Sequence, residues 1–247
     1  MTDSPRQIAL ITGGSRGIGR ATALRLARLG MLVIVGYHAN KAAAEETVAA
    51  LQGEGHVACR ISIEDADSIA QARDLVAGQF GRLDVLVNSG GRTKPVPLND
   101  LDGLDDALFD SIVQVNLRGP FSVIRAFRSL MEKSGDAVIV NVSSIAAKTG
   151  VGSNLAYCAA KGGLDTLTTG LAKVLGPTIR VFSVSPAGVD TDFVAGRSRA
   201  QLEAMADKTP LRKVTSPEDV ALAIEGAITH LTSSTGIALI VDEGRHL

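Results

Sequence analysis

The sequence is poor in cysteine and in aromatic residues: it has two cysteines, no tryptophan, two tyrosines and six phenylalanines among 247 residues. Cys59 and Cys158 lie too far apart in the chain to indicate a disulfide framework or a cluster of metal ligands. We therefore expect both to be free thiols in a reducing, cytoplasmic environment, and we expect no metal site.

Long apolar runs and an excess of charge of one sign are also lacking. No uncharged apolar stretch approaches the roughly 20 residues that span a bilayer. The opening segment carries Asp3, Pro5 and Arg6, and the apolar run after them is too short for the core of a signal peptide. The formal net charge is −1 with both signs scattered, so no basic field is available for nucleic acid. We expect neither a membrane nor a nucleic acid as a partner.

What the sequence does have is an alternation of two patterns from end to end. Apolar runs typical of strands occupy residues 7–12, 31–37, 57–61, 83–88, 137–143, 179–185 and 237–241. Helical periodicity occupies residues 18–29, 41–51, 67–79, 104–132, 154–175 and 217–230. This alternation predicts an α/β fold of the Rossmann type, a doubly wound parallel sheet of about seven strands with helices on both faces.

No linker, internal repeat or low-complexity segment interrupts this pattern, so we expect residues 1–247 to form a single domain. Pro120 lies inside the long helical stretch and predicts a kink or break there. Residues 187–216 show no clear pattern, and long loops in compact domains are usually functional lids or mobile segments.

A glycine-rich turn joins the first predicted strand to the first predicted helix. The glycines allow a tight turn and a close approach to a pyrophosphate, and the helix N-terminus offers N–H groups to phosphates. The spacing is Gly-x3-Gly-x-Gly rather than the more general G-x-G-x-x-G. The alternative is an ordinary strand-to-helix turn, but its place in an alternating chain favours nucleotide binding. The candidate cofactor-binding residues here are Gly13, Ser15, Arg16, Gly17, Ile18 and Gly19.

The end of the second strand bears on which nucleotide is bound. NAD-binding proteins usually place an acidic residue there, but this strand ends in Tyr37 and is followed by Asn40 and Lys41 without an acid. Tyr37 and Asn40 are candidate contacts, and Arg16 with Asn40 or Lys41 could bind a ribose 2′-phosphate. Arg16 and Lys41 could instead be solvated surface charges. We expect NADP(H) to be preferred, with NAD(H) possible.

The residues with the most telling chemistry are Tyr157 and Lys161, which lie on one face of a predicted helix. A free tyrosine has a pKa of about 10, and a nearby lysine cation lowers it toward the working range. Ser144 follows a strand at the same sheet edge as the glycine turn, where its hydroxyl could bind a carbonyl oxygen. Ser143 is a rival for that role by position.

Together with Asn88-Ser89-Gly90-Gly91 and Asn116, these motifs resemble the short-chain dehydrogenase/reductase family, most closely the 3-oxoacyl-[acyl-carrier-protein] reductase type. The resemblance covers nearly the whole chain, from Ile8 to Gly244. It implies a homotetramer and a variable substrate lid within residues 187–216.

The resemblance also implies a role for each matching residue. Tyr157 would be the general acid in reduction, and Lys161 would hold the nicotinamide ribose and lower the pKa of Tyr157. Ser144 would bind the substrate oxygen. Asn116, at a helix irregularity, would hold a water of a proton relay, although it could be a polar residue on a helix surface. Tyr157 and Lys161 would also contact the cofactor, as would Asn88, Gly90, Pro186, Val189 and Thr191.

The expected activity is therefore an NADPH-dependent reduction of a carbonyl group in a 3-oxoacyl thioester or another ketone. The substrate is a small molecule or an acyl chain on a carrier protein. Two alternatives stay open: a dehydrogenase of secondary alcohols, and a non-catalytic NADP-binding regulator. The chain departs from the family at Ser62, Phe182, Ala187 and Glu243, which suggests a divergent member without removing a catalytic group.

The substrate itself is only loosely constrained by the sequence. The lid carries five basic residues, which could attract an anionic substrate or could be solvated and balanced by Glu203 and Asp207. They are Arg197, Arg199, Lys208, Arg212 and Lys213. Arg92, outside the lid, could face the substrate or be an exposed loop charge. Arg125, Arg128 and Lys133 could dock an acidic carrier or simply solvate their helix. Ile145, Ala147, Val151 and Leu155 suggest an apolar pocket wall.

Overall fold

The computed structural model describes residues 6–196 and 198–247, and within them the strands form one parallel sheet. Its order is β3-β2-β1-β4-β5-β6-β7, so the chain starts in the middle and winds outward in both directions. This is the doubly wound arrangement that the alternation predicts. The strands are β1 (Ile8–Thr12), β2 (Leu32–Tyr37), β3 (Val57–Arg60), β4 (Val85–Asn88), β5 (Ala137–Val142), β6 (Ile179–Pro186) and β7 (Ala238–Val241).

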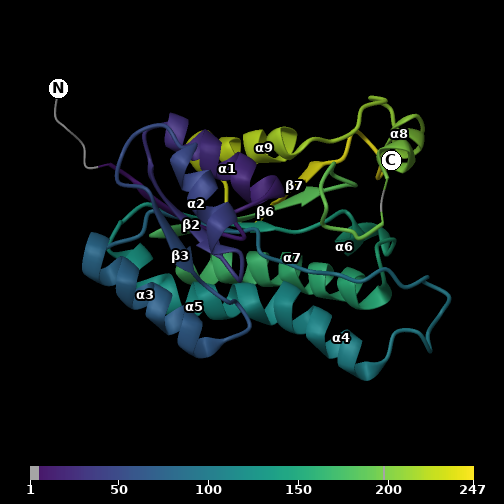
Figure 1. The fold of residues 1–247 in the computed structure, drawn as a ribbon, viewed down its shortest axis with the longest axis horizontal. Helices are drawn as coiled ribbons and strands as arrows, with labels where there is room; N and C mark the ends of the chain where they lie inside the picture. Colours follow the sequence, from purple (N-terminus) through teal and green to yellow (C-terminus); the bar gives the residue numbers. More distant parts are fainter. Residues whose placement is uncertain (1–5, 197) are drawn as a thin grey trace.

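Helices cover both faces of the sheet (Figure 1). One face carries α1 (Gly17–Arg28), α2 (Lys41–Ala49) and α9 (Pro217–Thr229). The other carries α3 (Ala66–Phe80), α4 (Asp106–Val113), α5 (Gly119–Glu132) and α7 (Leu155–Leu175). Each layer of helices encloses its own apolar core, one around Phe182 and one around Phe127. The central strands are apolar on both faces because both are covered.

The stretch 104–132 differs from a single helix kinked at Pro120. The structure has α4, then a π-helical turn η1 (Gln114–Arg118), then α5. Pro120 lies at the start of α5, which follows the π-helical turn without a break. The irregularity precedes the proline because the Asn116 side chain donates to the carbonyl oxygen of Ile112, one turn back, at 2.9 Å. A side chain that takes this acceptor competes with the regular backbone ladder.

Two short helices appear where the sequence pattern indicated none. α6 (Ala146–Thr149) follows β5, and α8 (Arg199–Ala206) lies within 187–216. α8 begins with a capping box of Ser198 and Gln201, and it buries only Leu202 and Ala206. So short an apolar stripe gives little periodicity to detect. Arg197 and the first five residues lie outside the described part of the chain. No helix within the described part is long and apolar enough to cross a membrane.

Candidate active site

Polar side chains form a row across the carboxyl edge of the sheet. Thr12, Asn88 and Asn141 are register partners on β1, β4 and β5. The Asn88 amide donates to Asn141 Oδ1 at 2.9 Å, and the Asn141 amide donates to Thr168 Oγ1 of α7 at 2.9 Å. Thr12 Oγ1 accepts from the backbone N–H of Gly90 at 3.1 Å. The row therefore fixes the ends of these strands and the loop after β4 relative to α7.

The glycine turn after β1 is packed so closely that side chains have no room. Gly13 has a φ of +65°, and a Cβ there would lie 2.9 Å from the Cα of Gly90. A Cβ on Gly19 would lie 2.2 Å from the Gly13 carbonyl oxygen. Two predicted cofactor loops, the glycine turn and the Asn88–Gly91 loop, thus touch each other through glycine backbone.

The N-terminus of α1 is open toward an anion. Arg16 occupies the capping position without a side-chain cap, and the first turn of the helix holds no acidic residue. Its unpaired backbone N–H groups and the positive end of the helix dipole suit a phosphate. Ser15 and Gly17 flank Arg16, and Ile18 and Gly19 continue the turn into the helix. The glycine turn and this uncapped terminus fit a dinucleotide.

The residues at the end of β2 and just after it have different structural partners. Tyr37 is buried in the core on the α1 side, so its ring serves packing. Asn40 caps α2 by accepting from the backbone N–H of Ala43 at 3.0 Å, and Lys41 pairs with Glu45 at 3.2 Å. The side chain of the exposed Arg16 makes no hydrogen bond or ion pair with any described residue. Among these cations, Arg16 is the one free to meet a phosphate.

Tyr157 and Lys161 come together on α7 as their spacing predicts. The Lys161 ammonium lies 5.6 Å from the centroid of the Tyr157 ring and donates to the Val142 carbonyl oxygen at 2.7 Å. The start of α7 is fixed by Asn154, whose Oδ1 accepts from the Tyr157 backbone N–H at 2.7 Å. Asn154 also donates to the Lys94 carbonyl oxygen at 2.8 Å. Sequence reasoning missed Asn154, although an asparagine just before a helix is a capping signal.

Burial shifts the pKa of Lys161. Lys161 is 5% exposed, and this desolvation lowers its pKa from 10.5 to about 8, while the carboxylate of Asp165 one turn later acts to raise it. One oxygen of Asp165 is buried without a hydrogen-bond partner among the described residues. Lys161 is thus a cation held close to its titration point beside a phenol.

The two serines after β5 are distinguished by their partners. Ser143 is buried and its hydroxyl donates to the Lys161 carbonyl oxygen at 3.3 Å. Ser144 Oγ accepts from the Ala146 backbone N–H at 3.1 Å and keeps its own proton for another acceptor. Position alone left the two as rivals, and the hydrogen bonds favour Ser144.

Asn116 lies in the π-helical turn and is fully buried. Its amide donates to the carbonyl oxygens of Arg92 at 2.8 Å and Ile112 at 2.9 Å. Its Oδ1 is buried with no partner among the described residues. A buried polar atom without a partner is unusual and suits a bound water or ligand.

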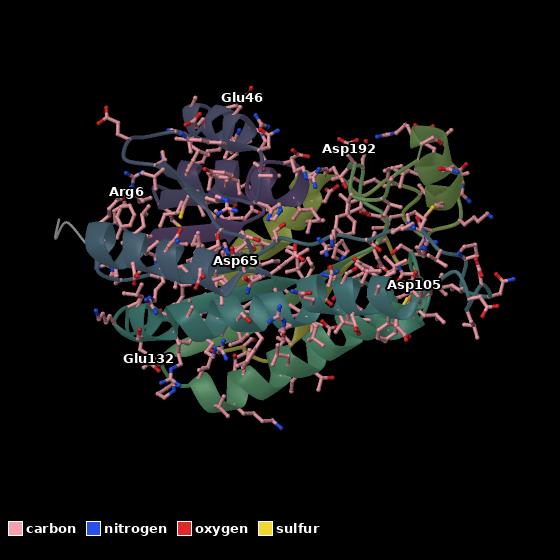
Figure 2. The ribbon with its side chains drawn as sticks, turned by 60° about the horizontal axis from the view of Figure 1, so that its bottom comes forward. Arg6, Glu46, Asp65, Asp105, Glu132 and Asp192 are labelled. Carbon is pink, nitrogen blue, oxygen red and sulfur yellow. The ribbon has the colours of Figure 1, made fainter. Side chains whose placement is uncertain are left out.

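The segment after β6 crosses the same edge of the sheet. The Pro186 carbonyl oxygen accepts from Ile145 at 3.0 Å, and Val189 pairs with Thr215 in an isolated parallel bridge. Thr191 Cγ2 lies 3.2 Å from where a Gly17 Cβ would be, so the segment contacts the glycine turn. The exposed Asp192 points outward (Figure 2). Phe193 contacts Tyr157, with ring centroids 6.0 Å apart, which sequence reasoning also missed.

Several charges near the site are paired. Arg92 forms a two-point ion pair with Glu64, both distances being 3.0 Å. In the segment after β6, Arg199 pairs with Asp190 and Glu203. Lys213 pairs with Asp219 at 2.5 Å. Of the expected apolar wall, Ile145 is buried whereas Val151 and Leu155 are exposed.

The potential metal ligands and the thiols of the chain are scattered. The described residues contain no group of three or more His, Cys, Asp or Glu side chains that could hold a metal ion. Cys59 and Cys158 are free, as expected, and burial raises the pKa of both thiols.

Comparison with known proteins agrees with this geometry. The family model described as short chain dehydrogenase matches residues 7–202. A Streptomyces violaceoruber protein provisionally named granaticin polyketide synthase ketoacyl reductase 2 is 38% identical, covering 100% of this chain and 99% of its own. Cis-4-hydroxycyclohexanecarboxylate dehydrogenase of Sinomonas cyclohexanicum is 36% identical, with 96% of each covered. A 3-oxoacyl-[acyl-carrier-protein] reductase of Synechocystis is 34% identical, covering 95% of this chain and 96% of its own.

A solved structure shares the fold of this chain. A provisionally described short-chain dehydrogenase/reductase of Burkholderia xenovorans superposes with a TM-score of 0.91 at 32% identity, with 99% of both chains covered. The fold and the site therefore define a nucleotide-dependent oxidoreductase. The chain belongs to the short-chain dehydrogenase/reductase family, is most like its 3-oxoacyl-[acyl-carrier-protein] reductase type, and is an NAD(P)-dependent oxidoreductase.

Proposed function

We propose that this protein is an NADPH-dependent carbonyl reductase in which Tyr157 protonates the substrate oxygen. The observation that carries the proposal is the placement of the Lys161 ammonium 5.6 Å from the Tyr157 ring, at the sheet edge that also holds the glycine turn. Ser144 and Asn116 complete the catalytic group at that edge. Residues 1–247 act in this proposal as one domain.

When bound, a nicotinamide would supply the hydride, and the chain's own residues would handle the proton and the charge. Tyr157 gives its phenolic proton to the oxygen as negative charge develops there. The hydroxyl group of Ser144 donates a hydrogen bond to the same oxygen. The Lys161 cation favours the phenolate left on Tyr157 and holds the nicotinamide ribose. Asn116 Oδ1 holds a water through which Tyr157 regains a proton.

The cofactor preference is proposed to be NADP(H) over NAD(H), with Arg16 as the main phosphate contact. The uncapped α1 terminus and the exposed, unengaged Arg16 support this, as does the lack of an acid between Tyr37 and Lys41. The remaining cofactor contacts are those expected from the sequence. They are Gly13, Ser15, Gly17, Ile18, Gly19, Tyr37 (through its backbone), Asn40, Asn88, Gly90, Pro186, Val189 and Thr191.

The substrate is a ketone, free or as a 3-oxoacyl thioester. Two relatives are named as ketoacyl or 3-oxoacyl reductases, which favours this direction. One relative is named as a dehydrogenase of a cyclic hydroxy acid, so oxidation of a secondary alcohol is the second candidate. A regulator without activity is disfavoured because Tyr157 and Lys161 are both present in contact.

The test is loss of reduced-nicotinamide absorbance against a panel of ketones that includes an acetoacetyl thioester, run with NADPH and with NADH. We expect turnover with NADPH and slower turnover with NADH. Cofactor binding without turnover of any ketone or alcohol would instead support the regulator.

The protein is also proposed to be a cytoplasmic homotetramer. Exposed Phe121 on α5 and Val174 on α7 provide apolar surface for subunit contact. Light scattering would then give four times the chain mass, and a monomer would contradict this part of the proposal.

A further inference from the structure

Within the described part of residues 187–216, Phe193 brings its ring into contact with that of Tyr157, the proposed proton donor. Its centroid lies 6.0 Å from that of Tyr157, and the two ring planes are tilted by 52°. Separations of this size are typical of aromatic rings in direct contact. The contact joins residues 36 positions apart in sequence, so it is created by the fold.

One edge of the Phe193 ring faces Gly91. A Cβ built on Gly91 would lie 3.5 Å from Phe193 Cε2 and 2.9 Å from Asn116 Oδ1. The ring edge and the unpartnered oxygen of Asn116 therefore border the same small space, which stays open because residue 91 is glycine. Phe193 thus lies beside both the Tyr157 ring and the small space next to Asn116 Oδ1.

The chain before Phe193 is held in place. Val189 pairs with Thr215 in the isolated bridge, and the Asp190 backbone N–H donates to the Thr215 carbonyl oxygen at 3.1 Å. Thr191 packs against Gly17, and its hydroxyl oxygen accepts from the Phe193 backbone N–H at 3.4 Å. The ring is therefore carried by an anchored segment rather than by a free loop end.

Building on the proposed carbonyl reduction, we propose that Phe193 determines specificity by forming the aromatic wall of the substrate site. Because the two rings are in contact, a ketone whose oxygen reaches Tyr157 would have a substituent beside the Phe193 ring. A flat substituent can stack on a phenyl ring or meet its edge. A tetrahedral, branched substituent collides with it. The substrate class is therefore ketones whose carbonyl carries a planar or unbranched group.

The first test compares acetophenone, which has a flat substituent, with pinacolone, which has a branched one. In Phe193→Ala we expect the kcat/KM ratio of acetophenone to pinacolone to fall about tenfold, as expected when one apolar wall contact is lost. Phe193→Leu should give a smaller fall and guards against a variant that fails to fold. Phe109→Ala removes an exposed phenylalanine on α4 and should leave the ratio unchanged. An unchanged ratio in both Phe193 variants would overturn the proposal.

A second test does not depend on turnover. The chain has no tryptophan, so Phe193→Trp introduces a single indole at the wall, and Phe109→Trp places one outside the site. With NADP⁺ present, acetophenone should produce a saturable change in the emission of Phe193→Trp and none in Phe109→Trp. If acetophenone leaves the emission of Phe193→Trp unchanged, Phe193 does not line the substrate site and the proposal is wrong. If the emission changes but the protein reduces no ketone, the proposed function is wrong while Phe193 still lines a binding site.

Discussion

The ammonium of Lys161 lies 5.6 Å from the ring centroid of Tyr157 and donates to the Val142 carbonyl oxygen at 2.7 Å. The hydrogen bond anchors the lysine to the end of β5, so its position relative to the tyrosine does not rest on α7 alone. In the proposed mechanism this cation stabilises the phenolate that Tyr157 leaves when it gives up its proton. The proposed proton transfer depends on this pair.

Activity should fall as the pH rises through the titration of Lys161. Burial lowers the pKa of Lys161 to about 8, so its charge is present below that pH and is lost above it. The Asp165 carboxylate raises this pKa, so Asp165→Asn should move the alkaline fall in kcat to lower pH. Asp102→Asn, in an exposed loop, is the matched control. A pH profile that is the same in Asp165→Asn and the parent would contradict the coupling.

The free energy of unfolding should rise with pH as Lys161 loses its proton, whereas activity should fall. The folded pKa of Lys161 is below its ordinary value of 10.5, so folding buries a charge at a cost of up to about 3 kcal/mol below pH 8. Between about pH 8 and 10.5 the folded lysine loses its proton first, and this cost is relieved. Urea unfolding should therefore show the parent gaining stability relative to Lys161→Met over that range. A constant difference between the two would argue against a lowered pKa of Lys161 in the fold.

The two neighbouring serines should separate catalysis from packing. Ser144→Ala removes the hydroxyl proposed to bind the developing oxyanion, and we expect kcat to fall about 100-fold. Ser143→Ala removes only the hydrogen bond to the Lys161 carbonyl oxygen, so it should cost about 1 kcal/mol of stability with kcat nearly unchanged. Steady-state kinetics and urea midpoints measure both. The reverse pattern would assign the substrate oxygen to Ser143.

Cofactor preference should depend on Arg16 more than on Lys41. Loss of a charge-assisted hydrogen bond to phosphate costs about 1.5–3 kcal/mol, so Arg16→Ala should weaken NADPH binding by at least about tenfold. Its affinity for NADH should hardly change. Lys41→Ala, whose ammonium already pairs with Glu45, is the control with a smaller expected effect. Fluorescence titration of the reduced cofactors measures all three proteins. Equal losses for NADPH and NADH in Arg16→Ala would contradict a phosphate contact.

The sheet could be predicted because a parallel sheet covered on both faces requires continuous apolar runs, as in β1 and β5. The meeting of Tyr157 and Lys161 followed from helical spacing, and the common edge of Ser144 and the glycine turn followed from strand direction. The family resemblance implied the irregularity at Asn116. The Asn116 side chain also donates to the Arg92 carbonyl oxygen, a contact distant in sequence that no local pattern encodes.

Other parts of the site could not be predicted for similar reasons. Whether Arg92 faces a substrate or pairs with Glu64 depends on how the loops after β3 and β4 approach each other. The contact of Phe193 with Tyr157 depends on the path of the segment after β6. Apolar periodicity reports which face of an element is buried, and it carries no information on how loops meet above a sheet.

The most direct measurement of the central claim is NADPH-dependent ketone reduction by Tyr157→Phe beside Tyr37→Phe. These are the two tyrosines of the chain, and Tyr37 is packed in the core. Loss of a general acid lowers rates by about 100- to 10,000-fold. We expect Tyr157→Phe to lose turnover on that scale while binding NADPH normally, and Tyr37→Phe to keep nearly full kcat. A Tyr157→Phe protein with near-parental kcat would contradict the account.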